Sequence, residues 1–148
     1  MADIGAQAGV APRFVSKTVT FTGASGAGLA DVAVPVFTVT GQVVIWVLAV
    51  YCTTLLTESG ATATVALGTA ANTALLTPAT NAVDIDANEF WDNASPQLSG
   101  TVLPALHNFA ALSGSVIITP AVANVTGGVL RFDLYWLPLS SDGNVVAS

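Results

Sequence analysis

Hydrophobic and polar residues alternate along much of the chain with a period of two, which is typical of β-strands that bury one face. From Phe14 to Thr22 one set of alternate positions is apolar except for Lys17, and the other set is polar except for Phe14. Because successive side chains of a strand point to opposite faces, the apolar set is predicted to face a core.

Further strands are predicted where β-branched and aromatic residues gather between clusters of glycine, proline and serine. Pro35 predicts an edge strand or a bulge, because proline cannot donate to the ladder. The apolar run 43–52 predicts a central strand that is covered on both faces, and together with 61–67 it predicts a hairpin. The predicted strand regions are 13–22, 32–39, 43–52, 61–67, 98–103, 115–119 and 129–137.

These seven or eight short strands, without a convincing amphipathic helix, predict an all-β fold: a single-domain antiparallel β-sandwich, jelly-roll-like. The length of 148 residues fits one domain. We expect the sandwich over 13–139. The small, aperiodic residues 1–12 predict an extended N-terminal arm, and residues 140–148 predict a polar C-terminal tail.

Charged residues are scarce, at 8% of the chain against about 25% in a typical soluble domain. With 3 basic and 9 acidic side chains on a folded surface of roughly 7,000 Å², about one charge falls on each 600 Å². Free domains usually carry many more interspersed charges. The sequence therefore favours a surface that is largely covered in an assembly; a neutral, hydrated surface is the alternative.

The sign and placement of the charges argue against nucleic acid as a partner. The net charge is −6, and Arg13, Lys17 and Arg131 form no basic stripe that could neutralise phosphates. A membrane partner is not expected, because the apolar run 43–56 has about 14 residues, fewer than the ~20 of a spanning helix.

The loop that holds Asp84, Asp86 and Asn88 is the only candidate metal site. These residues alternate as oxygen ligands do at the start of a calcium loop. Glu89 stands where an EF-hand needs glycine, so an EF-hand is excluded and an irregular Ca²⁺ site remains open. The favoured interpretation is a helical turn in which Asp86 is the N-cap and Glu89, three residues later, completes a capping box.

The residues that could support catalysis are few. His107 is the only histidine, and Cys52, the only cysteine, lies within an apolar strand. Neither is part of a recognisable nucleophile motif, so we expect no enzyme, no cofactor and no intrachain disulfide.

Tyr135 and Trp136 are adjacent in a predicted strand, so one of the two is expected in the core and the other on the surface. An exposed aromatic ring could anchor an interface or serve as a sugar platform, and we favour the interface. The predicted interface residues are Arg13, Phe14 and Trp136.

Four segments of the chain resemble small proteins that are encoded among the virion genes of tailed bacteriophages. They are PRFVSKTVTFTG (12–23), VFTVTG (36–41), ANEFW (87–91) and LYWLPLSSDGN (134–144). The resemblance extends over most of the chain, and it implies a β-sandwich virion component similar to capsid decoration or cement proteins. Such proteins commonly sit as trimers on the outside of the shell, across capsomer junctions. The resemblance assigns no binding residues.

The expected function is therefore that of a decoration protein, which stabilises the capsid through subunit contacts. Its partners would be the major capsid protein and further copies of itself, and it would be made in the host cytoplasm and reside on the virion surface. The alternative is a tail or fibre module that binds a receptor glycan, using Trp91 or Trp136 together with the acidic loop.

Overall fold

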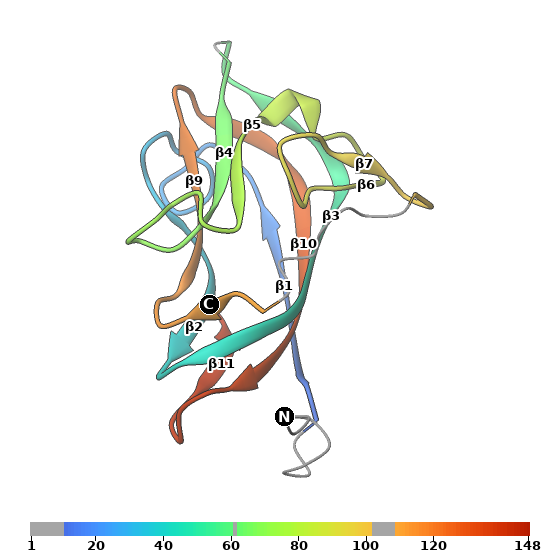
Figure 1. Ribbon diagram of the computed structural model, residues 1–148. Helices are drawn as coiled ribbons and strands as arrows, with labels where there is room; N and C mark the ends of the chain where they lie inside the picture. The colour runs from blue at the N-terminus through green and yellow to red at the C-terminus, as the bar shows by residue number, and fades with distance from the viewer. Residues whose placement is uncertain (1–10, 61, 102–108) are drawn as a thin grey trace.

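The computed structural model describes residues 11–60, 62–101 and 109–148, and it consists of two antiparallel β-sheets that face each other (Figure 1). The first sheet contains, in order, β1 (Arg13–Thr20), β10 (Val125–Pro138), β3 (Val43–Glu58), β6 (Glu89–Phe90) and β7 (Gln97–Leu98), and β8 (Ala111–Leu112) also pairs with β3. The second sheet contains β11 (Asn144–Ala147), β2 (Val34–Thr40), β9 (Val116–Ala121), β4 (Thr64–Gly68) and β5 (Thr77–Asn81). One 3₁₀ turn, η1 (Ala82–Asp84), joins β5 to the segment before β6.

The predicted all-β sandwich is confirmed. In the described residues eight strands have four residues or more, and β6, β7 and β8 have two residues each. Six of the longer strands, β1, β2, β3, β4, β9 and β10, fall in predicted regions, whereas β5 and β11 were not predicted. The predicted strand over 98–103 is wrong for residues 99–101, which form a turn, and residues 102 and 103 lie outside the described residues. A two-residue strand is too short for a period of two to be recognised.

The strand pairs are nested along the chain. The innermost pair is β4 with β5; around it lie β3 with β6, then β2 with β9, and outermost β1 with β10. The pairs alternate between the two sheets, so the chain crosses from one sheet to the other after each of β1, β2 and β3.

The core lies between the sheets and follows from the alternation of side chains. Between Leu130 and Trp136 on β10 the buried positions are Leu130, Phe132, Leu134 and Trp136, and each intervening residue points outward. Val19 and Phe21 are buried as the sequence predicts. Of the other large side chains, Phe37, Leu48, Leu67, Ile118 and Trp91 fill the interior.

The predicted hairpin over 43–67 is wrong, because β3 and β4 belong to different sheets. β10 occupies one edge of β3, and β6 and β8 pair along the other, so no edge is left for β4. The chain instead crosses to the second sheet, where β4 pairs with β9 and β5. The Glu58 carboxylate accepts the Ala63 N–H at 2.6 Å in this crossing.

The predicted polar tail contains a strand. β11 pairs with β2 at the edge of the second sheet, and Val145 is only 5% exposed because it covers the end of the core. β2 is therefore not an edge strand. The alternative for Pro35, a bulge, is correct: the β2–β9 register shifts between Pro35 and Phe37. Of the predicted arm, residues 1–10 lie outside the described residues.

Candidate interaction surface

The aromatic residues divide into two groups. Five are in the core: Phe21, Phe37, Trp91, Phe132 and Trp136. The other six lie on the outer side of the first sheet or against it, and we call them the aromatic face: Phe14, Trp46, Tyr51, Phe90, Phe109 and Tyr135.

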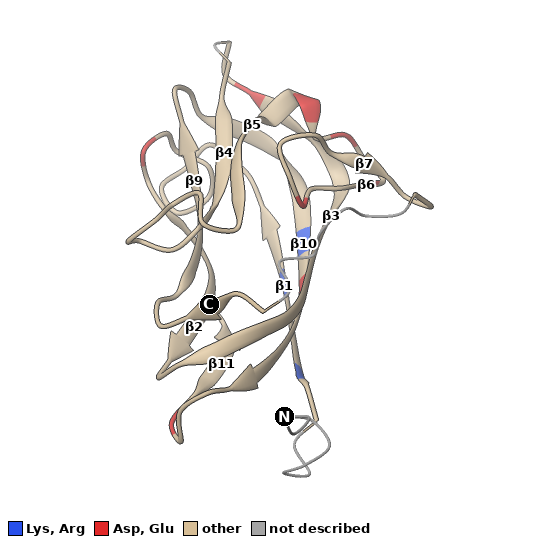
Figure 2. Ribbon diagram, in the orientation of Figure 1, with Lys and Arg blue, Asp and Glu red and all other residues tan. Residues whose placement is uncertain are grey.

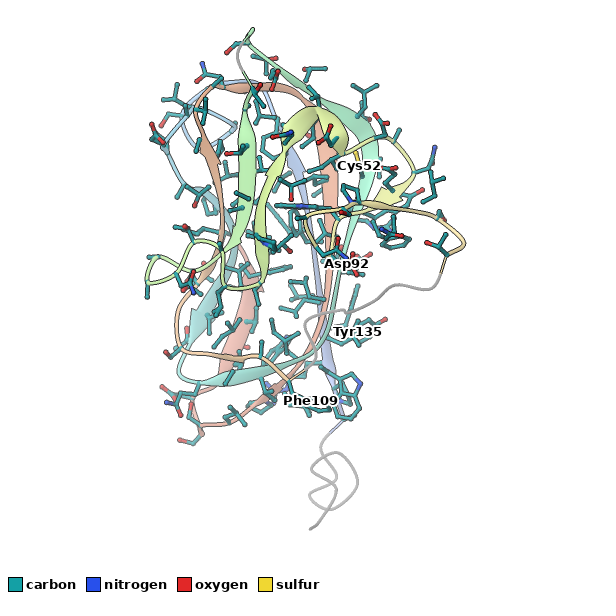
Figure 3. The ribbon with its side chains drawn as sticks, turned by 45° about the horizontal axis from the view of Figure 1, so that its top comes forward. Cys52, Asp92, Phe109 and Tyr135 are labelled. Atoms are coloured by element: carbon teal, nitrogen blue, oxygen red, sulfur yellow. The ribbon has the colours of Figure 1, made fainter. Side chains whose placement is uncertain are left out.

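The most exposed part of the aromatic face is at the end of the sheet where β1 begins. Phe14 on β1 is directly opposite Tyr135 on β10, and their ring centroids are 4.9 Å apart. A register shift between Tyr135 and Trp136 leaves Trp46, next to Val47 on β3, without a partner residue on β10. The Trp46 ring packs edge-to-face against the Phe109 ring, with their centroids 5.8 Å apart. Figure 3 shows Tyr135 and Phe109 at the same end of the molecule, pointing away from the core.

The second part of the aromatic face is four residues farther along the strands, about 13 Å away. Here the rings of Tyr51 and Phe90 are 5.0 Å apart, and the Arg131 guanidinium lies 5.3 Å from the Tyr51 ring. The Tyr51 hydroxyl donates to Asn88 Oδ1 at 3.0 Å, so the ring is fixed from both ends.

A polar row separates the two groups of rings. Asp133 accepts hydrogen bonds from Ser16 Oγ at 2.7 Å and from Arg131 Nε at 2.8 Å. Arg131 and Asp133 are thus a surface ion pair, whose contribution to stability is small. Their charges cancel, so the outward side chains of β1, β10 and β3 carry no net charge.

The other basic residues of the first sheet do not join this row. Lys17 has the inward orientation on β1, and its Nζ donates to the backbone carbonyl of Ser148 at the edge of the second sheet. Arg13 lies over the Trp136 ring, with Cζ 5.2 Å from its centroid, and covers that end of the core.

The prediction that Trp136 is an interface residue is wrong for the folded chain. Trp136 shares the inward orientation of Leu134 on β10 and is 2% exposed, whereas Tyr135 is 44% exposed. Phe14, at 55% exposed, lies at the surface as that prediction requires, and Arg13 is exposed as well. Trp91 is fully buried, so neither tryptophan of the expected glycan site reaches the surface.

The second sheet has a different outer face. Its strands contain no charged residue and one aromatic residue, Phe37, which is buried. Its outward positions are mainly threonine, proline and alanine, and among its large hydrophobic residues only Val146 is exposed. Figure 2 shows that the acidic residues gather instead around the end of β3, η1 and β6.

The predicted calcium residues Asp84, Asp86 and Asn88 lie in this acidic region. The Glu89 carboxylate accepts the Asp86 N–H at 2.9 Å, which is one half of the predicted capping box, but a turn and β6 follow instead of a helix. The oxygen of Asn88 is already engaged by Tyr51. In the described part of the chain no three His, Cys, Asp or Glu side chains are grouped as metal ligands.

Asp92 is the one buried charged residue among those described, and it is 3% exposed. Neither of its carboxylate oxygens has a hydrogen-bond partner there. In the view of Figure 3 Asp92 lies below Cys52 and above Tyr135. Among the described residues it belongs to no group of three or more His, Cys, Asp or Glu side chains that could hold a metal ion.

Cys52 faces the core from β3 and is fully buried. Burial raises the pKa of its thiol to about 11, and a backbone hydrogen bond with Thr54 partly offsets this shift. The thiol is therefore an unreactive core group at neutral pH. His107, its only potential catalytic partner in the sequence, lies outside the described residues.

A hollow of about 510 Å³ lies between segments 69–75 and 111–117. Thr69, Ala71, Ala111, Ser113 and Gly114 are among the described residues that line it, and none of these described lining residues is titratable. Within the described residues, no helix is long and apolar enough to cross a membrane.

Sequence reasoning missed most of the aromatic face. Trp46 and Tyr51 belong to the run that was predicted to be covered on both faces. Phe109 gave no periodic signal because it lies in a turn. Comparisons with known protein families, with curated protein sequences and with solved structures found no match for this chain.

Proposed function

We propose that this protein is a structural component of a tailed-phage virion, a decoration protein that binds the capsid surface and stabilises the shell. The observation that carries the proposal is the aromatic face, which places six rings, four of them exposed, on a chain with few charges. Exposed apolar patches of this kind mark sites of protein association.

The nested strand pairing supports this function at the level of the fold. We infer that it is the connectivity of a jelly roll, in which one long hairpin is wound into two sheets. Jelly rolls recur in viral capsid proteins and in lectins. Fold alone does not determine function, so the aromatic face remains the principal support.

The proposed mechanism requires no catalysis. The two-sheet core provides a rigid body, and its outer surfaces bury area against the major capsid protein and against further copies of the chain. A stable contact buries on the order of 1,600 Å² in total. Contacts that span a junction between capsomers would have to break before the capsomers separate, so the shell would resist internal pressure.

A tail or fibre module that binds a glycan is the second candidate. The observation in its favour is the polar row of Ser16, Asp133 and Arg131 between the exposed rings around Tyr135 and the half-buried pair of Tyr51 and Phe90. Aromatic rings can stack on sugars while such polar groups bond to their hydroxyls.

The copy number and position of the protein in purified particles test the proposal. We expect hundreds of copies on the outer shell, counted by quantitative mass spectrometry and located by electron cryomicroscopy of the phage that encodes the chain. A few copies at one vertex would instead assign it to the tail or fibre. Absence from the particle would refute both candidates.

A further inference from the structure

We infer that the aromatic face is the surface on which a second copy of this chain packs. The inference rests on the proposed assembly role and names the partner of one surface. Four observations support it: the exposed area, the composition of β3, the charge balance and the strained position of Phe109.

The exposed rings provide a large part of the area that a stable contact needs. Phe14, Trp46, Phe109 and Tyr135 are 55%, 38%, 68% and 44% exposed. With roughly 200 Å² for each free aromatic side chain, these four residues alone present about 400 Å². A stable interface buries about 800 Å² on each partner, and the neighbouring half-exposed side chains of β3 and β10 extend the patch toward that size.

The composition of β3 indicates that its outer face is meant to be covered. Residues 43–52 are entirely apolar, as in a strand buried on both sides. Its inner residues, such as Leu48 and Val50, are fully buried. Its outer residues Val47, Ala49 and Tyr51 are only partly buried by the described chain. A second protein layer would complete the burial that the sequence predicts.

The charge balance allows another copy of the chain to form this second layer. The whole chain carries a net charge of −6, and an approach through the acidic region around η1 and β6 would bring like charges together. The outward charges of β10 are Arg131 and Asp133, which cancel. This is the surface of the first sheet on which two copies can meet without repulsion. When the same face meets itself about a two-fold axis, Arg131 of each copy can approach Asp133 of the other.

Phe109 adds evidence that the face is used. Its φ of 62° is in the left-handed region, which bulky residues rarely adopt, and its ring remains 68% exposed against Trp46. Its N–H donates to the Ile45 carbonyl at 2.7 Å, so the backbone is held in this conformation. Strain of this kind is concentrated at functional positions.

The test compares the mass of the wild-type chain in solution, by light scattering over a range of concentrations, with that of variants. Tyr135→Asp places like charges in the contact. Phe109→Gly removes the ring and relieves the backbone, so this variant is expected to fold normally. Val146→Asp is the matched control, because Val146 is 48% exposed on the other sheet. Denaturation curves verify that each variant is folded.

We expect the wild type to self-associate, Tyr135→Asp and Phe109→Gly to weaken association about tenfold or more, and Val146→Asp to leave it unchanged. A monomeric wild type, or association that withstands both face variants, would overturn the inference. A monomer that binds glycans through Phe109 would overturn it in favour of the second candidate. Particle copy number is measured separately, so self-association through this face without particle binding would refute the proposed function alone.

Discussion

The indole Nε1 of Trp91 donates a hydrogen bond of 2.9 Å to the hydroxyl of Thr80 in the buried space between the sheets. Trp91 directly follows β6 of the first sheet, and Thr80 belongs to β5 of the second, so the bond links the two layers. The Thr80 hydroxyl in turn donates to the Pro78 carbonyl at 3.0 Å. Both polar groups are thereby satisfied in the core.

Thr80→Val is expected to lower the free energy of unfolding by about 1–3 kcal/mol, because it leaves the buried indole N–H without an acceptor. Urea denaturation measures the change. Thr53→Val is the control: the Thr53 hydroxyl donates to the Val129 carbonyl at the surface, and its loss should cost about 0.5 kcal/mol or less. Equal costs for the two variants would show that the buried bond contributes nothing specific.

Adjacent residues on β10 should respond very differently to truncation. Trp136→Ala is expected to destabilise the fold by about 3–5 kcal/mol, because it opens a cavity in the core. Tyr135→Ala removes an exposed ring that packs against the neighbouring Phe14 ring, so about 1 kcal/mol or less is expected. The comparison is made from chemical denaturation at one temperature. The reverse order would contradict the assignment of inner and outer faces.

Gly28 is expected to tolerate alanine poorly. Its φ is 112°, and an added Cβ would lie 2.2 Å from the Val125 carbonyl oxygen, which belongs to the strand that Gly28 packs against. Gly26 in the same loop also has a positive φ, of 71°, but has open space around it. Gly26→Ala should therefore cost about 1–2 kcal/mol and Gly28→Ala clearly more. Thermal unfolding of both variants checks the order.

The buried thiol of Cys52 predicts a loss of stability in alkali. Burial raises its pKa from 9.0 to about 11, so above pH 9 the unfolded chain releases a proton that the folded chain retains. Stability is then lost as the pH rises toward 11, by about 1.4 kcal/mol per pH unit from this group. Cys52→Ala should lack this component. The advantage of wild type over Cys52→Ala should thus shrink between pH 8 and pH 11, and a constant difference would contradict the shift.

Pattern reasoning predicted the strands well where the alternation is long. β1, β9 and β10 agree with the predicted regions, and the predicted inward set from Val15 to Phe21 faces the core. It failed where neighbours in space decide the outcome. β3 and β4 are separated by a short turn, as in a hairpin, but β10 and β6 already occupy the edges of β3. Strand pairing depends on competing partners that are distant in sequence.

Only part of the aromatic face could be predicted from the sequence. Because Tyr135 and Trp136 are adjacent in a strand, one of them had to face the core, but a period of two does not say which one. Register settled it: Trp136 is opposite Ile45, which is buried, and Tyr135 is opposite Val47 on the outer face. Phe109 comes from a distant turn and reaches Trp46 only because the chain folds back beside β3.

The sequence by itself determined the all-β class, the apolar faces of the long strands and the scarcity of charge, because each depends on local alternation and on composition. The tertiary structure alone decided which sheet each strand joined and which apolar side chains were left outside. Those outcomes depend on which strands occupy each edge and on how much core two sheets can enclose. The apolar run of β3 shows the difference: composition made it fit for burial on both sides, and the fold covered only one.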